Sequence, residues 1–322
     1  ERRGVKVDDQ EFSISIAVGA ACGENAFIEA DIALHSAREH QRSFEVFDSD
    51  SRLKQQIESN IRWVKRIRDA IREERITVFA QPILEAGTGR VSKYECLMRL
   101  VEADGSVVTP YFFLEAAKRA RIYTSLTRIV IQRAFSFFAN REDEFSINLT
   151  ARDILDEMTA ELLLGEAERL GVANRLVLEL VESEGIENFD EVSRFIERAK
   201  KIGCSVAVDD FGTGYSNFEY LLKLDVDYIK IDGSLIRHVD EDKNARIVAE
   251  TVVDFAKRLG LATIAEFVHS DSVQAVVEEM GVDYLQGFLL GEPLPLDQLP
   301  SQPSPCLANT PVLVERCLGS EV

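Results

Sequence analysis

Two adjacent aspartates, Asp209 and Asp210, follow the apolar run Val206–Val208 and precede Gly212 and Gly214. The run predicts a strand that is buried on both faces, as in a parallel sheet. Neighbouring carboxylates at the end of such a strand repel each other and lose hydration, which is costly unless a positive charge lies between them. A divalent metal ion would supply that charge. On this stretch alone, an alternative stays open in which Asp209 caps the next helix and Asp210 is solvated.

Polar side chains close most of the predicted strands, including this one. They are Glu95, Asn148, Glu179, Glu182, Asp209, Asp210, Lys230, Asp232, Glu266 and Gln286. Taken singly, such a residue is more often a cap, a salt bridge or a solvated end than a ligand. Together, hard oxygen donors without His or Cys among them favour magnesium or manganese over zinc. If the strands close into a barrel, these carboxylates meet at one rim and cannot all ionise without cations.

Strands and helices alternate from Ile76 onward. The patterns predict strands at 76–83, 91–101, 144–149, 175–181, 204–210, 226–232, 262–267 and 283–289. They predict helices at 111–120, 124–139, 151–170, 189–202, 217–223, 242–259 and 271–280. Eight strands interleaved with helices over about 220 residues indicate an α/β fold, a (β/α)8 TIM-like barrel. The first two strands are joined only by Glu85–Arg90, which is too short for a crossover helix, so the first strand should be antiparallel.

Three further segments flank the predicted barrel domain, residues 75–296. Residues 1–48 predict a small α+β fragment, with strands at 12–19 and 43–47 around a helix at 26–40, too short to bury a core alone. Residues 49–74 predict a linker helix with an apolar stripe that would couple two domains or the two subunits of a homodimer. The alternative that this helix packs on its own barrel stays open. Residues 297–322, with several prolines and no periodicity, predict a disordered tail.

Composition bounds the partners and the compartment. The formal charge is −19, from 37 Lys+Arg and 56 Asp+Glu, and no basic cluster is present, which argues against DNA or RNA as partners. The five cysteines form no metal-binding or disulfide pattern, so a cytoplasmic location is expected. No run is long and apolar enough for a membrane segment. The first residue, Glu1, leaves room for upstream sequence that includes a membrane anchor.

Eight ordered motifs resemble those of the EAL domain family, bacterial cyclic-di-GMP phosphodiesterases, over about residues 60–296. The motifs are Phe79-Ala-Gln-Pro82, Tyr94-Glu-Cys-Leu-Met-Arg99, Ile147-Asn-Leu-Thr150, Leu178-Glu-Leu-Val-Glu-Ser183, Asp209-Asp-Phe-Gly-Thr-Gly-Tyr-Ser216, Lys230-Ile-Asp232, Ala265-Glu266 and Gln286-Gly-Phe288. The family fold is a barrel with an antiparallel first strand, in agreement with the loop-length argument. Residues 1–48 are similar to the C-terminal part of a GGDEF domain without its signature loop.

The resemblance implies hydrolysis of cyclic-di-GMP to linear pGpG with two Mg2+ or Mn2+ ions, which activate a bridging water and neutralise charge in the transition state. It implies these ligands for one ion: Glu95, Asn148, Glu179 and Asp209. Asp209 would bridge to the second ion, with Asp210 and Glu266 at or near it.

The resemblance also assigns residues to catalysis and to substrate. The implied catalytic residues are Lys230, Glu266, Asp210 and Glu182. Lys230 matches a lysine that touches the attacking water; the alternative is that Lys230 forms a salt bridge to Asp232. Glu182 matches a glutamate that steadies the loop after the fifth strand. The implied substrate contacts are Gln81, Leu97, Arg99 and Gln286.

Three positions depart from the family pattern. Cys96 stands where the signature usually has Ala, and a thiol that behaves as a small hydrophobe fits there. Phe267 and His269 replace the usual Gly and Glu after Glu266. The alternatives are therefore an inert cyclic-di-GMP receptor that signals through the linker helix, or a barrel that serves as a dimerisation platform. All metal ligands are retained, whereas inert members of the family usually lose one or more, so the enzyme is favoured.

Overall fold

The computed structural model describes residues 3–7, 10–14, 17–22, 26, 30, 33, 34, 37, 43–47, 49–181, 189–212 and 223–300. The chain divides into two units, Glu1–Lys65 and Arg66–Val322. The helix α2 (Ser49–Arg72), found where the linker helix was predicted, runs from the first unit into the second. Each unit is described by itself.

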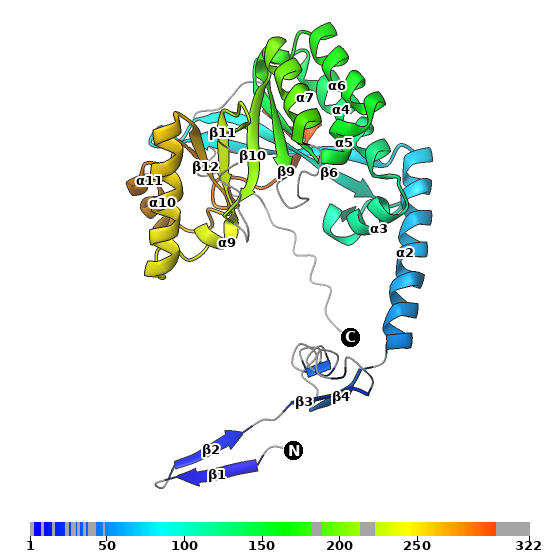
Figure 1. The fold of residues 1–322 in the computed structure, drawn as a ribbon, viewed down its shortest axis with the longest axis vertical. Helices are drawn as coiled ribbons and strands as arrows, with labels where there is room; N and C mark the ends of the chain where they lie inside the picture. The colour runs from blue at the N-terminus through cyan, green and yellow to red at the C-terminus, as the bar shows by residue number, and fades with distance from the viewer. Residues whose placement is uncertain are drawn as a thin grey trace. The chain divides into compact units, whose positions relative to one another are not determined.

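The second unit contains a closed barrel (Figure 1). In hydrogen-bonded order its strands are β5 (Ile76–Glu85), β6 (Val91–Val101), β8 (Glu144–Leu149), β9 (Leu176–Val181), β10 (Ser205–Phe211), β11 (Tyr228–Ile231), β12 (Ala262–Ala265) and β13 (Tyr284–Leu285). Strand β13 pairs with β5 and so completes the ring. The predicted α/β barrel is thereby confirmed.

Strand β5 is antiparallel to both of its neighbours in the ring, β6 and β13, whereas the pairs from β6 round to β13 are parallel. The turn between β5 and β6 contains Gly87 and Gly89 at φ 74° and 64°, backbone conformations that a residue with a Cβ rarely adopts. The register opposes Gln81 to Glu95. The antiparallel first strand that the short loop predicted is therefore correct.

Helices pack on the outside of the barrel (Figure 1). They are α3 (Leu114–Arg119), α4 (Tyr123–Phe138), α5 (Ala151–Leu155), α6 (Glu157–Arg169), α7 (Phe189–Lys201), α9 (Gly233–Ile236), α10 (Lys243–Leu259) and α11 (Asp271–Met280). The longer helices bury one apolar face; α7, for example, buries Val192, Phe195 and Ile196. Gly260 and Gly281 end α10 and α11 in the left-handed conformation that favours glycine.

Two helix predictions were wrong in detail. The single helix predicted at 151–170 is divided into α5 and α6, because the Asp156 side chain accepts a hydrogen bond from the Thr159 N–H and so caps a new helix. The helix predicted at 111–120 begins as a 3-10 turn, η1 (Pro110–Phe112), before α3. The helix predicted at 217–223 lies almost wholly outside the described residues.

The remaining short elements border the barrel. They are β7 (Val107–Val108), η2 (Ala173–Arg175), β14 (Leu294–Pro295) and η3 (Leu296–Gln298). Strand β14 adds to β5, and Leu299 is buried. Arg141 donates a hydrogen bond to the carbonyl oxygen of Pro300. Residues 297–300 of the predicted tail are thus described, while residues 301–322 lie outside the described part.

A buried lysine closes the end of the barrel at which the parallel strands begin. The Lys93 side chain is 1% exposed, and its ammonium lies 3.9 Å from the ring centroid of Tyr228 and 4.3 Å from that of Tyr284. Glu144 Oε2 lies 3.4 Å from the same nitrogen. Two aromatic faces and one carboxylate therefore offset the cost of burying this charge.

In the first unit, β1 (Arg3–Val7) and β2 (Gln10–Ile14) pair antiparallel, and β3 (Val18–Ala20) and β4 (Phe44–Val46) pair parallel. The predicted strand at 12–19 thus corresponds to parts of β2 and β3. Where it is described between 26 and 37, the chain is helical. The GGDEF-like origin of this unit and a homodimer remain predictions. Within the described residues, no helix has the length and apolar character needed to span a membrane.

Candidate active site

Buried polar side chains gather where the parallel strands of the barrel end. Glu95 projects from β6, Asn148 from β8, Glu179 from β9 and Asp209 from β10, and Glu266 follows β12 directly. Glu179 is 1% exposed, and Glu95 and Asp209 are also buried. Closure of the barrel therefore brings together the oxygen-bearing residues that the sequence placed on separate strands.

Lys230, on β11, lies at the centre of this acidic cluster. Its ammonium is within ion-pair distance of four carboxylates, at 2.7 Å from Glu266, 2.8 Å from Glu179, 2.9 Å from Asp209 and 3.5 Å from Glu95. Asp232 is not among the ion-pair partners of Lys230 in the described chain; its side chain accepts a hydrogen bond from the Ser234 N–H and caps α9. The alternative of a Lys230–Asp232 salt bridge is therefore wrong.

A chain of amides holds Glu95 in place. Asn148 Nδ2 donates to Glu95 Oε1 at 2.7 Å, and Gln286 Nε2 donates to Glu95 Oε2 at 2.5 Å. Gln286 Nε2 also lies 3.2 Å from Gln81 Oε1, and Gln81 donates to the carbonyl of Gly291. Asn148 and Gln286, both predicted from the sequence, thus meet at the Glu95 carboxylate, and the predicted Gln81 is connected to it through Gln286.

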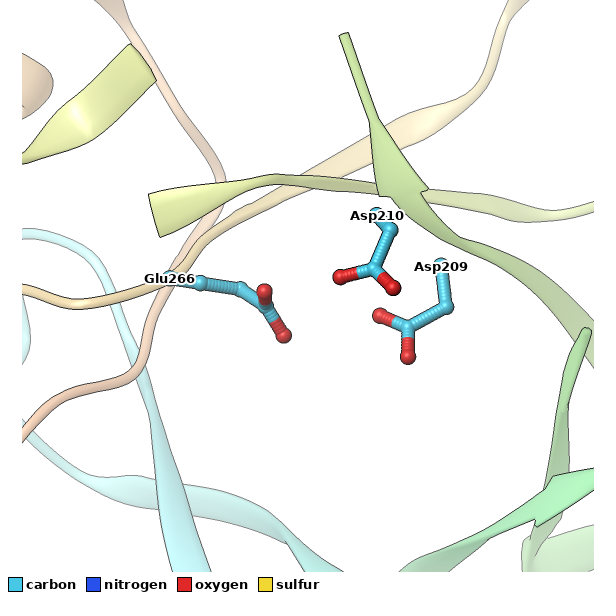
Figure 2. A group of neighbouring side chains, drawn as sticks. All are labelled: Asp209, Asp210 and Glu266. Carbon is cyan, nitrogen blue, oxygen red and sulfur yellow. The ribbon is translucent and has the colours of Figure 1, made fainter. Parts of the chain in front are cut away.

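The donor set fits a hard divalent cation. Asp209, Asp210 and Glu266 each offer an oxygen within 4.8 Å of the others (Figure 2). In Figure 2 both aspartates extend from the end of β10, and Glu266 faces them from the opposite side. Among the described residues, the buried atoms Asn148 Oδ1 and Glu179 Oε1 have no hydrogen-bond donor. Unsatisfied oxygens beside a carboxylate cluster are the ligands that Mg2+ and Mn2+ prefer.

Burial controls the protonation of this cluster. Desolvation, opposed by Lys230 and reinforced by neighbouring carboxylates, raises the pKa of Glu179 to about 8 and that of Glu266 to about 8. Burial together with Asp209 raises the pKa of Asp210 to about 6. Burial acts in the same sense on Glu95, but Lys230 and two amide hydrogen bonds outweigh it and lower its pKa. One ammonium is therefore too little charge to keep all these groups ionised.

A cavity of about 430 Å3 opens beside the cluster. The predicted site residues in its lining are Gln81, Glu95, Glu266 and Gln286. Leu97 and Arg99 do not line it in the described structure; Arg99 donates to the Met98 carbonyl and lies over the Phe79 ring. Glu182 lies outside the described residues. The roles assigned to these three residues remain predictions.

The cavity also contains two residues that break the family pattern and one that the sequence did not single out. Phe267 is 44% exposed and adopts φ 58°, and the guanidinium carbon of Arg237 lies 4.3 Å from its ring centroid. The Phe267 carbonyl accepts at 3.2 Å from His269 Nδ1. Arg237 follows the capped helix α9. The sequence places Arg237 five residues after the Lys230-Ile-Asp232 motif, close enough to belong to the same site. No sequence pattern showed that α9 would bring its guanidinium to Phe267.

Comparisons with known proteins agree with this geometry. A cyclic di-GMP phosphodiesterase of Shewanella oneidensis, PdeB, is 26% identical over 300 residues, 88% of this chain and 35% of that protein. The structure of the PaMucR phosphodiesterase with c-di-GMP is 26% identical with a TM-score of 0.70, covering 74% of this chain and 100% of that one. The c-di-GMP-bound FimX EAL domain of Pseudomonas aeruginosa has the same fold at 24% identity, TM-score 0.67 and coverages of 72% and 96%.

The chain spans about a third of the length of the curated relatives it matches, 35% in the case of PdeB. The model of the family described as the EAL domain matches residues 64–293, which include the whole barrel and its acidic cluster. The chain therefore belongs to the EAL domain family.

Proposed function

We propose that this chain is a metal-dependent phosphodiesterase that hydrolyses cyclic-di-GMP to the linear dinucleotide pGpG. The observation that carries the proposal is the convergence of six oxygen-bearing side chains around Lys230 at the edge of a cavity. They are Glu95, Asn148, Glu179, Asp209, Asp210 and Glu266. The activity named for PdeB and the ligand in the PaMucR structure support the choice of substrate.

The donor set suits two Mg2+ or Mn2+ ions. When bound, such ions lower the pKa of a water molecule and neutralise charge on the phosphodiester. Glu95, Asn148, Glu179 and Asp209 would hold one ion. Asp209 would be shared with the second ion, beside Asp210 and Glu266, whose oxygens already lie close together. The burial of these residues makes an added cation favourable, because it restores charge balance in a desolvated site.

The remaining residues position the substrate and the proton. Lys230 is fixed within 3 Å of three carboxylates, so its ammonium is placed to orient or protonate an oxygen in the reacting group. Gln81 and Gln286, although buried and hydrogen-bonded, line the cavity and would contact the substrate from there. Leu97, Arg99 and Glu182 keep their predicted roles in substrate contact and loop support.

A product assay tests the proposal. Purified protein is incubated with cyclic-di-GMP and Mg2+ or Mn2+, and the nucleotides are separated by chromatography. We expect pGpG to accumulate, and excess EDTA to abolish its formation and lower the melting temperature. Ca2+ should bind but support little hydrolysis, because it tolerates loose geometry. Glu95→Ala, prepared in parallel, controls for contaminating phosphodiesterases.

The receptor alternative makes a different prediction in the same experiment. Cyclic-di-GMP would bind in Ca2+ with micromolar or tighter affinity, yet no pGpG would form in Mg2+ or Mn2+. That result, obtained with folded protein that binds the metals, would replace the enzyme with a sensor. Undiminished hydrolysis in excess EDTA would contradict the metal-dependent site altogether.

A further inference from the structure

Phe267, like the exposed Phe288, is an aromatic side chain in the lining of the cavity. It lines the same cavity as Glu95, Glu266 and Gln286, directly after the proposed metal ligand Glu266, and 44% of its surface is exposed. Exposed aromatic side chains that line one cavity beside a few polar groups are typical of a ligand-binding pocket. The position of Phe267 therefore points to a flat, apolar partner.

The backbone at Phe267 is held in an unusual conformation. At φ 58° a residue with a Cβ crowds its own carbonyl, and such strain persists only where the surroundings hold it. Gly233 leaves room for the side chain, since a Cβ there would lie 2.7 Å from the Phe267 Cβ. On the ring itself, the Arg237 guanidinium carbon lies 4.3 Å from the centroid, within cation–π range. The ring is thus held at the cavity edge by its neighbours.

Arg237 is suited to support the ring. In the described structure it is the only Lys or Arg in the cavity lining, and no carboxylate forms an ion pair with it there. A guanidinium stacked on a phenyl ring covers one face of the ring and leaves the exposed remainder for a ligand. Such a surface matches a purine base, and stacking on an aromatic ring depends little on which base is present.

We propose that Phe267, positioned by Arg237, is the stacking surface for one guanine base of the cyclic dinucleotide, and thereby sets the affinity of this site for its substrate. The inference rests on the proposed function and deepens it. The acidic cluster would hold the reacting phosphodiester through metal ions, while Phe267 binds a part of the substrate remote from the chemistry. Binding energy from a remote group acts on substrate and transition state alike, so it lowers KM without changing kcat.

Substitution of Phe267 tests this. Binding of cyclic-di-GMP is measured by calorimetry in Ca2+, and kcat and KM are measured in Mg2+, for wild type, Phe267→Gly, Phe267→Tyr and the control Phe112→Ala. Phe112 is also an exposed phenylalanine, at 59%, but lies outside the cavity. We expect Phe267→Gly to raise Kd and KM about tenfold with kcat within about twofold, and Phe267→Tyr and Phe112→Ala to match wild type.

The melting temperature separates a recognition role from a structural one. Glycine adopts φ 58° freely, so Phe267→Gly should melt no lower than wild type although it binds more weakly. Arg237→Ala should weaken binding in the same direction, and Arg237→Lys, which keeps the charge but not the planar guanidinium, should restore it only in part. A lowered melting temperature in Phe267→Gly with unchanged Kd and KM would overturn the inference.

The outcomes distinguish this inference from the function on which it rests. If wild type forms pGpG and all variants share one KM, the phosphodiesterase stands and Phe267 does not contact the base. If wild type binds cyclic-di-GMP without hydrolysis and Phe267→Gly weakens binding, the base site stands and the enzyme does not. If wild type neither binds nor hydrolyses cyclic-di-GMP, both are wrong.

Discussion

Lys230 Nζ lies 2.8 Å from Glu179 Oε2, an ion pair that joins β11 to β9 across the intervening strand β10. Both side chains are 1% exposed. A buried pair of this kind contributes little net stability, but removal of one partner costs about 3–5 kcal/mol because it leaves an uncompensated charge. Three further carboxylates surround the same ammonium, so Lys230 balances a cluster rather than one partner.

Lys230→Ala is expected to lower turnover of cyclic-di-GMP by about a hundredfold or more, while binding in Ca2+ stays within about tenfold. We expect this loss because the ammonium would act on the reacting oxygens, whereas the proposed metal ions would dominate binding. Steady-state kinetics and calorimetry on one preparation measure both quantities. Normal hydrolysis by the variant would show that Lys230 is structural.

The same variant separates the ammonium from the metal ions. In EDTA, Lys230→Ala should melt below wild type, because the cluster then loses the ammonium that balances its ionised carboxylates. Added Mg2+ or Mn2+ should remove most of that difference. A variant whose melting temperature stays low in saturating metal would show that Lys230 is needed for the fold with cations bound.

Glu95→Ala and Asp209→Ala are expected to remove most activity, whereas Asp232→Asn should have a mild effect. Asp232 caps α9 through the Ser234 N–H, and asparagine caps a helix about as well as aspartate. Asp232→Ala, which removes the cap, should cost about 1 kcal/mol of unfolding free energy. Activity assays and urea unfolding check both. Equal loss of activity in Glu95→Ala, Asp209→Ala and Asp232→Asn would place Asp232 in the metal site.

The raised carboxyl pKa values predict a pH dependence in the presence of EDTA. The pKa values of Glu179 and Glu266 rise from 4.5 to about 8 in the folded chain, so the folded state holds protons that the unfolded chain releases. Their contribution to stability is full at low pH and is lost as the pH rises through about 8. Melting temperatures in EDTA should therefore fall between about pH 5 and pH 8, and Glu179→Gln should flatten that slope.

Metal binding should show the opposite pH trend. Divalent ions bind the carboxylate forms, so binding releases protons and strengthens over the pH range in which the two carboxyls ionise. Calorimetric titration with Mn2+ in buffers of different ionisation enthalpy counts the released protons. Binding that is independent of pH, with no proton release, would show that Glu179 and Glu266 are already ionised.

Lys93→Ala is expected to destabilise the barrel without affecting the site. The side chain fills the closed end between Tyr228 and Tyr284, so its removal leaves a cavity and should cost about 2–4 kcal/mol. Lys93→Met keeps the volume and should cost much less. Urea unfolding gives the free energies, and kcat measured below the unfolding range should match wild type. A large loss of kcat in Lys93→Met would connect this end to catalysis.

The barrel was predictable from sequence because its strands are buried on both faces and read as apolar runs. The strand predicted at 144–149 is β8, and the one at 91–101 is β6. Helix boundaries were less predictable. The apolar spacing continues through 151–170, and only the hydrogen bond from Thr159 to Asp156 shows that a second helix starts there.

The metal-ligand candidates were predictable for the same reason: each follows an apolar run, and closure of the ring brings the ends together. The partners of Lys230 were not, because Asp232 follows β11 directly in the sequence, whereas the Lys230 ammonium reaches Glu179 on β9 and Asp209 on β10 inside the barrel. The contact of Arg237 with Phe267 depends on the turn of α9 and on a positive φ, neither of which a spacing pattern encodes.

The direction of β5 decides where the chain enters the barrel. Ile76, its first residue, pairs with Leu100 near the end of β6, on the same side as the acidic cluster, and the Val101 N–H bonds to the Arg75 carbonyl. In a barrel of only parallel strands, the preceding segment would join at the far end. Here the last turns of α2 lead directly into the strand that carries Gln81, so a rotation of that helix would reach the cavity through a single strand.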